Sequence, residues 1–238
     1  MKFSTSDRAY LEKRKQFAEK SSHRELWSIV DHWPLYVGVA NLSRWVAIQD
    51  LVRESLDVPG DIAEFGSWRG ANLLYMAKLL QILDPLSQKR IHCFDSFQGL
   101  TAFSPHDGAE MTESRGDYRG SFEELLGVID LYELNDTICI HKGLIEDTLE
   151  KSLTAAPART FSLVYCDTDL YESTKVILEQ MHPRMAKGGL FVFDEWNHDK
   201  YPGEGVAANE FLKKHSTDYE VRSVRGARQP SLVIKKLR

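Results

Sequence analysis

Short apolar runs alternate with stretches of helical periodicity from Asp61 to the C-terminus. The apolar runs predict seven β-strands, at Asp61–Phe65, Ile91–Phe94, Thr137–His141, Phe161–Cys166, Gly189–Phe193, Tyr219–Val224 and Ser231–Lys235. The clearest helical segments between them are Ala71–Leu83, Phe122–Ile129, Ser173–Met181 and Gly205–Lys214. Strands that alternate with helices are typical of parallel sheets with crossover helices. The pattern therefore predicts an α/β fold with a seven-stranded, mostly parallel, doubly wound sheet and an antiparallel C-terminal strand.

The first 57 residues follow a different pattern. Charged residues dominate up to Arg24, and apolar residues then recur at roughly helical spacing as far as Val52. Breaks at Trp33-Pro34 and Val37-Gly38 interrupt this spacing. We therefore expect a helical N-terminal extension or lid over residues 1–57 and a Rossmann-like domain over residues 58–238.

The composition fits a soluble, cytoplasmic α/β protein. Of the 238 residues, 42% are hydrophobic, which suffices for a sizeable core. The net charge of −5 comes without a polybasic block, so we expect no binding to nucleic acid or to an anionic membrane. No apolar run has the length of a signal peptide core or a membrane span. Cys93, Cys139 and Cys166 lie singly in apolar runs, and we expect them in the core.

A glycine turn, EFGSWRG, follows the first predicted strand from Glu64 to Gly70. Such a turn before a helix lets a ligand approach backbone amides. The nicotinamide fingerprint needs a second glycine two places after the first, where Trp68 stands, so a dinucleotide is disfavoured. S-adenosylmethionine has no phosphate, and Glu64 can face its cationic methionine portion. The alternative is a purely structural connection. We expect these cofactor contacts: Glu64, Phe65, Gly66, Ser67 and Gly70.

The next two predicted strands also end in polar residues. Asp95 closes the second strand, at the position from which a carboxylate accepts hydrogen bonds from ribose hydroxyls in this fold. The third strand ends where adenine would lie, and Glu146 or Asp147 can meet its exocyclic amine. A turn aspartate and helix caps remain alternatives for these acids. We expect these further cofactor contacts: Asp95, Ser96, Lys142 and Gly143.

Four acidic residues follow the fourth and fifth predicted strands: Asp167, Asp169, Asp194 and Glu195. Adjacent strand ends lie close together in a parallel sheet, and like charges at that range repel unless a cation or a shared proton compensates them. Oxygen donors without histidine or cysteine favour magnesium, manganese or calcium over zinc, and we expect magnesium. The alternative is a set of solvated loop acids and helix caps.

The longest connection without a clear apolar period runs from Gly99 to Gly120. A loop of that length after a strand end is placed to cover a pocket, although it can also be a mobile excursion. The sequence leaves the roles of several nearby residues open between acceptor contact and packing, namely His106, Tyr118, Tyr171 and Trp196. His198 is a candidate base, although isolated surface histidines are common.

The motifs DIAEFGSWRGANLLYMA, FDSFQGL, KGLIEDTL, YCDTDLYEST and GGLFVFDEWN together resemble the TylF/MycF family of class I S-adenosylmethionine-dependent sugar O-methyltransferases. The similarity runs from about Pro59 to the C-terminus. Members of that family finish macrolide and aminocoumarin antibiotics. The family usually ends its fifth strand with two aspartates, whereas the second acid here is Glu195.

The resemblance implies a magnesium site and a sugar acceptor. Asp167, Asp194 and Glu195 would bind the ion, with Asp167 also next to the cofactor. Asp169 would act as the general base, and we prefer it to His198 for this role. The ion would chelate two adjacent acceptor hydroxyls and make one of them acidic enough for Asp169 to take its proton. The oxygen would then displace the sulfonium methyl group in line.

Two other functions remain open on the sequence. A catechol-type O-methyltransferase would use the same metal chemistry on a planar aromatic diol, and an accessory protein would bind S-adenosylmethionine without turnover. We also expect a small-molecule acceptor and a homo-oligomer, a dimer or higher. Trp27, Trp33 and Trp45 suit a subunit contact as well as the core.

Overall fold

The computed structural model describes residues 26–238, so the charged segment before Arg24 and the Trp27 side chain lie outside this description. The chain divides into a unit that ends at Leu42 and a unit from Ser43 to Arg238. The smaller unit contains helix α2 (Leu26–Asp31) and the 3-10 helix η1 (Trp33–Leu35), and helix α3 (Val39–Ser55) begins in it. Both predicted breaks fall between α2 and α3, and the break at Trp33-Pro34 lies within η1. None of the described helices has the length and apolar character that a membrane crossing requires.

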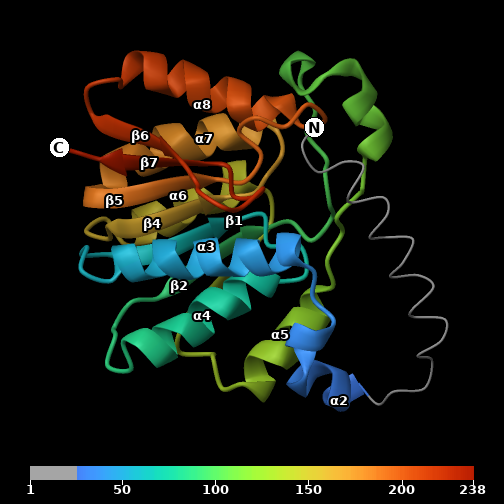
Figure 1. Ribbon diagram of the computed structural model, residues 1–238. Coiled ribbons are helices and arrows are strands. Elements are labelled where there is room, and N and C mark those ends of the chain that lie inside the picture. Colours follow the sequence, from blue (N-terminus) through green and yellow to red (C-terminus); the bar gives the residue numbers. More distant parts are fainter. Residues whose placement is uncertain (1–25) are drawn as a thin grey trace. The chain divides into compact units, whose positions relative to one another are not determined.

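The larger unit is built on a seven-stranded sheet (Figure 1). The strands are β1 (Asp61–Phe65), β2 (Ile91–Asp95), β3 (Ile138–Lys142), β4 (Phe161–Cys166), β5 (Met185–Phe193), β6 (Tyr219–Ser223) and β7 (Leu232–Lys236). Their order is β3-β2-β1-β4-β5-β7-β6, and β7 pairs antiparallel with both β5 and β6. The first five strands pair in parallel. The predicted doubly wound sheet with its antiparallel C-terminal strand is confirmed.

Two groups of helices cover the two faces of this sheet. Residues of α4 (Ala71–Leu83), α5 (Phe122–Leu131) and the second half of α3 share one apolar core with the sheet. Residues of α6 (Ile145–Ala155), α7 (Tyr171–Met181) and α8 (Pro202–Lys214) share the other. Figure 1 shows α6, α7 and α8 together along one side of the strands. The part of α3 from Ala47 to Ser55, which we assigned to the extension, is therefore core in the larger unit.

Alternation along β4 shows why both faces are buried. Leu163 and Tyr165 lie in the first core, whereas Val164 and Cys166 lie in the second. Successive side chains of a strand point to opposite faces, so a strand covered on both sides is mostly apolar. Burying a large apolar side chain contributes roughly 1.5–3 kcal/mol, and all six residues of β4 are buried.

The predicted elements differ from the observed ones mainly at their ends. β5 begins at Met185 rather than Gly189, and α6 adds to the helices named from the sequence. Cys93 and Cys166 are buried as expected, whereas Cys139 is partly exposed. The carboxyl ends of β1, β2, β4 and β5, where the candidate residues lie, all point to one edge of the sheet because these strands are parallel.

Candidate active site

The glycine turn after β1 packs tightly against the loop after β4. Gly66 has φ 80°, and a Cβ at this position would lie 1.9 Å from the carbonyl oxygen of Asp167. The Asp167 amide donates a hydrogen bond to the carbonyl of Phe65 at 2.9 Å. Only glycine tolerates both the positive φ and this approach. The turn is therefore held beside the first of the four acids.

Asp95 fixes the other side of the turn. Its Oδ2 accepts hydrogen bonds from the backbone amides of Ser67 at 2.7 Å and Trp68 at 2.9 Å, and its Oδ1 accepts one from Phe97 at 2.6 Å. A carboxylate has about four lone-pair positions, so room remains for a ribose hydroxyl. Trp68 itself has φ 50° and is 48% exposed.

Glu64 is buried in the middle of the sheet between β2 and β4, and it is 1% exposed. Neither of its carboxyl oxygens has a hydrogen-bond partner among the described residues. Burial raises the pKa of Glu64 to about 8; the charge of Arg44 opposes this shift, and Asp95 and Asp194 add to it. A buried carboxyl without a partner costs free energy, so this position suits a cationic ligand group.

The other predicted cofactor residues lie at the same edge. Gly70 precedes α4 with φ 79° and packs on Leu125. Lys142 ends β3 beside β2, and the Gly143 amide donates to the carbonyl of Asp95 at 3.0 Å. Ser96 accepts a hydrogen bond from the Gln98 amide at 3.1 Å.

Arg44 of α3 lies among the acids that follow β4 and β5. Its guanidinium donates to Asp167 Oδ2 at 3.1 Å and to Asp194 Oδ2 at 2.9 Å. The Arg44 side chain is 21% exposed and that of Asp194 is 3% exposed. Tyr165 donates a further hydrogen bond to Asp194 Oδ1 at 2.5 Å. One permanent cation therefore bridges the ends of two neighbouring strands.

The other two acids of the cluster, Asp169 and Glu195, have raised pKa values. Asp169 is 8% exposed, and burial together with the charge of Asp194 raises its pKa to about 7. Burial, then Asp194, raises the pKa of Glu195 to about 8. Glu195 Oε1 accepts a hydrogen bond from Gln229, whereas Oε2 accepts none from the described residues and lies 3.8 Å from His198 Nδ1. The cluster thus holds more carboxylate than Arg44 alone neutralises.

Asp167, Asp194 and Glu195 do not form a ready ligand set in this arrangement. Within residues 26–238, a single group of at least three His, Cys, Asp or Glu side chains brings ligand atoms within 4.8 Å of one another, and it lies elsewhere. Arg44 occupies oxygens of both aspartates instead. An all-oxygen donor set with excess negative charge still fits a hard divalent cation, provided that Arg44 gives up at least one of its partners.

The loop from Gly99 to Gly120 is folded onto this edge rather than forming a loose excursion. It contains the 3-10 helices η2 (Pro105–Asp107) and η3 (Ala109–Ser114). Asp107 is buried, accepts from Ser104 at 2.6 Å and accepts from the Tyr171 amide at 2.7 Å. Tyr118 makes a 2.7 Å hydrogen bond to Tyr201 and contacts Trp68 edge-on at 5.6 Å. The loop therefore contacts the glycine turn, α7 and the residue before α8.

The aromatic and histidine candidates have mainly structural partners. His106 stacks on Tyr171 at 4.1 Å, and the Tyr171 hydroxyl donates to Glu210 at 2.7 Å. Trp196 donates from its indole to Asn209 at 3.3 Å. Burial lowers the pKa of His198, with Arg228 contributing next.

Sequence reasoning missed three residues of the site. Arg44 belongs to no recognisable sequence motif, and Tyr165 resembles any other aromatic residue of a buried strand. Glu204 lies in the first turn of α8 and is fully buried. Glu204 accepts a hydrogen bond from the Glu195 amide at 2.7 Å, and burial raises its pKa well above the ordinary value. An acid in a glycine-flanked segment, GEG, was the one available signal for Glu204.

Curated O-methyltransferases are similar to part of this sequence. A 4'-O-methyltransferase of Streptomyces olivaceus that acts on 8-demethyl-8-(2,3-dimethoxy-alpha-L-rhamnosyl)-tetracenomycin C is 30% identical over 152 residues, covering 60% of this chain and 55% of that protein. Demethyldecarbamoylnovobiocin O-methyltransferase of Streptomyces niveus is 30% identical over 156 residues, covering 63% and 56%. The aligned part thus spans little more than half the length of these relatives.

Solved structures match more of the chain. The calicheamicin methyltransferase CalS11 superposes with a TM-score of 0.82 at 27% identity, covering 94% of this chain and 90% of that one. The O-methyltransferase NovP gives a TM-score of 0.70 at 25% identity, with 83% and 81% covered. The sequence pattern of the family described as macrocin-O-methyltransferase (TylF) matches residues 5–226, so it also includes N-terminal residues where the resemblance was less clear. This chain belongs to the macrocin O-methyltransferase (TylF) family.

Proposed function

We propose that this protein is an S-adenosylmethionine-dependent, magnesium-assisted O-methyltransferase that acts on a hydroxyl group of a sugar or a glycosylated natural product. The observation that carries the proposal is the buried acidic cluster of β4 and β5 beside a glycine turn and the unpartnered Glu64. A carboxyl-lined cofactor site for a cationic ligand and an oxygen-rich metal site at one sheet edge suit methyl transfer to a weakly acidic hydroxyl.

The residues of the turn fit the cofactor. Glu64 would meet the cationic methionine end, which would give its buried carboxyl the partner that the described residues do not supply. Asp95 would accept from the ribose while it continues to hold the Ser67 amide. The cofactor would supply the methyl group on its sulfonium. Phe65, Gly66, Gly70, Ser96, Lys142 and Gly143 would line the remainder of this site.

The donor set fits a hard divalent ion at Asp167, Asp194 and Glu195. When bound, magnesium would stabilise negative charge on an acceptor oxygen. Arg44 would then move from Asp167 or Asp194, which requires one ion pair to exchange for another. Glu195 reaches further than an aspartate and has one buried oxygen free of hydrogen bonds from the described residues.

Asp169 would be the general base. Its carboxyl is buried beside the other acids, and its raised pKa of about 7 brings proton affinity close to working pH. The proton would pass from the acceptor hydroxyl to an Asp169 carboxyl oxygen, and the methyl group would pass from sulfur to the acceptor oxygen. Tyr118 and Tyr201 would cover the acceptor from the loop side, where their hydroxyl groups are joined at 2.7 Å.

The acceptor class comes from the Streptomyces olivaceus relative, whose acceptor carries a rhamnosyl group. We extend the same class to this chain, with a homo-oligomer as the expected assembly. The exposed apolar residues Val39 and Val46 of α3 suit such a contact.

The test compares three acceptor groups in one assay of adenosylhomocysteine formation. Nucleotide sugars and glycosides should be methylated, and Asp169→Asn should lose turnover while it retains cofactor binding. Asp199→Asn, an exposed acid in the same region, is the matched control. Preference for catechols would replace the sugar assignment, and cofactor binding without turnover on any acceptor would favour an accessory protein.

A further inference from the structure

Two histidines and an aspartate meet at the edge of the sheet opposite the candidate active site. His182 directly follows α7, His215 directly follows α8 and Asp218 directly precedes β6. β5 and β6 run in the same direction because both pair antiparallel with β7, so both begin at this edge. The acids of the active site follow the opposite ends of β4 and β5. This cluster is therefore separate from the proposed methyl-transfer chemistry.

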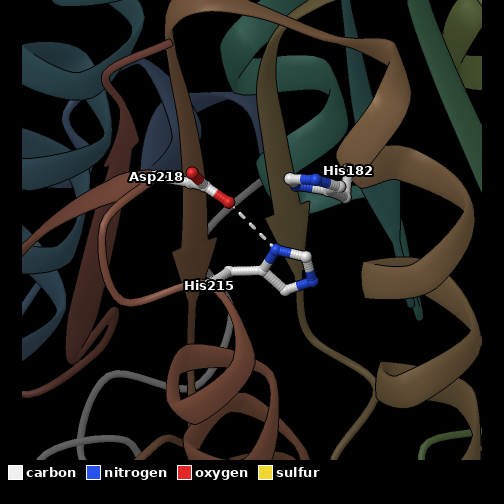
Figure 2. A group of neighbouring side chains, drawn as sticks. All are labelled: His182, His215 and Asp218. Atoms are coloured by element: carbon white, nitrogen blue, oxygen red, sulfur yellow. Dashed lines mark hydrogen bonds and ion pairs between the residues drawn. The ribbon is translucent and has the colours of Figure 1, made fainter.

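The three side chains have the spacing of a metal site. One ligand atom of each lies within 4.8 Å of the other two, and no other group in the described part of the chain does so. His215 Nδ1 lies 3.1 Å from Asp218 Oδ2, and the rings of His182 and His215 are 4.2 Å apart. Two tetrahedral ligands that are each ~2.0–2.1 Å from a zinc ion lie about 3.3 Å apart. Figure 2 shows the Asp218 carboxylate directed toward the His215 ring, with His182 facing the same space.

The local electrostatics favour a cation. α7 and α8 both end here, and helix C-termini carry partial negative charge. Burial lowers the pKa of His182, with the charge of His215 adding to the effect, so the neutral ligand form is favoured. Hydrogen bonds from His215 and, to a smaller extent, from Arg238 lower the pKa of Asp218.

Neighbouring groups orient the ligands and set limits on the site. Tyr219 bonds His182 Nδ1 at 2.8 Å, a contact of the kind that holds a metal-binding ring in place. Lys236 donates to the carbonyl of His182 at 2.8 Å. Arg238 donates to Asp218 Oδ1 at 2.9 Å, which leaves Oδ2 facing His215. Lys236 and Arg238 are the cations that oppose metal binding here.

We propose that His182, His215 and Asp218 bind a divalent transition-metal ion, zinc in the first instance, with water in the fourth position. Two imidazoles and one carboxylate suit zinc, nickel or copper better than magnesium or calcium. The ion would replace the proton between His215 and Asp218 and would join the ends of α7 and α8 to the start of β6. Its effect would be on stability, since the proposed cofactor and acceptor residues lie at the opposite ends of the strands.

The test is a zinc titration of the full chain by calorimetry, together with the visible spectrum of the cobalt(II) form. We expect one equivalent of zinc, a rise in Tm and a tetrahedral cobalt spectrum. His215→Gln and His182→Gln should each weaken zinc binding at least 10-fold, with Asp218→Asn as a variant that keeps both rings. Metal-free circular dichroism and Tm values select the variants that are folded.

The matched control is His198→Gln, because His198 is also a partly buried histidine near a carboxylate, 3.8 Å from Glu195 in the acidic cluster. Unchanged zinc affinity in this variant supports the proposal. Zinc binding that is lost in His198→Gln and kept in His215→Gln would place the ion at the active site instead. Absence of zinc binding to the unmodified chain would also overturn the proposal.

Discussion

Binding of the cofactor should release a proton from Glu64. In the ligand-free protein this carboxyl has a pKa of about 8, raised by burial, with Arg44 opposing the shift and Asp95 and Asp194 reinforcing it. At pH 7 it is therefore mostly protonated. A cationic methionine end is stabilised by the ionised carboxylate, so binding must remove this proton. Affinity for the cofactor should consequently rise with pH.

The magnitude follows from the ionised fraction of Glu64. With a pKa of about 8, roughly 1% of the group is ionised at pH 6, roughly 9% at pH 7 and about half at pH 8. If the pKa of Glu64 in the cofactor complex lies well below 6, affinity for the cofactor rises about 50-fold from pH 6 to pH 8. At 1.36 kcal/mol per tenfold change, this is about 2.3 kcal/mol.

Calorimetry in two buffers with different ionisation enthalpies measures both the affinity and the proton count. We expect about 0.9 proton released per cofactor at pH 7 by the same fraction. Glu64→Gln should abolish the pH slope, while Asp147→Asn, an exposed acid near the predicted adenine position, should leave it intact. Adenosylhomocysteine keeps the amino group but lacks the sulfonium charge. A comparison of its pH slope with that of S-adenosylmethionine therefore shows which of the two cationic groups interacts with Glu64. A slope that persists in Glu64→Gln would refute the reasoning.

Four further outcomes are expected. Asp169→Asn should lower kcat about 100-fold or more with little change in cofactor affinity, as single-turnover kinetics and calorimetry can show. Chelator should abolish turnover and magnesium restore it; full activity in chelator contradicts the metal assignment. Arg44→Gln should tighten magnesium binding, and it should destabilise the metal-free protein by about 1–3 kcal/mol in urea unfolding, since Asp167 and Asp194 lose their cation. Glu64→Gln should be more stable than the parent by roughly 3 kcal/mol at pH 7. Folding raises the pKa of Glu64 from 4.5 to about 8, so the parent protein loses stability as the pH rises between these two values. Equal pH dependence of unfolding in the parent and the variant would count against this prediction.

The grouping of residues at the strand ends could be predicted from the sequence, because it follows from the parallel topology of the sheet. Parallel strands joined by crossover helices bring their carboxyl ends to one edge, so Asp95, Asp167 and Asp194 could be grouped without knowing any distance. Helix α6 was harder, since its apolar stripe consists of Ile145, Leu149 and Leu153 between charged residues. Such a short stripe hardly differs from a polar connection.

Arg44 could not be predicted in the same way. Its contacts with Asp167 and Asp194 span 123 and 150 residues of sequence, and they depend on where α3 packs against the sheet. Helical periodicity predicts which face of a helix is apolar, but it does not predict where along the sheet that face packs. Glu204 presents the same difficulty, since burial of an acid in a helix is decided by the loop that packs over it.

Asp169 has a backbone φ of 61°, a left-handed conformation that side chains seldom adopt, and its carboxyl is buried among other acids. The backbone conformation alone costs about 1 kcal/mol or more. A protein selected only to fold and to hold a cofactor would gain stability from glycine or asparagine at this position. Aspartate here keeps a buried acid in a left-handed backbone position, as we expect where the carboxylate itself has a role in the proposed reaction.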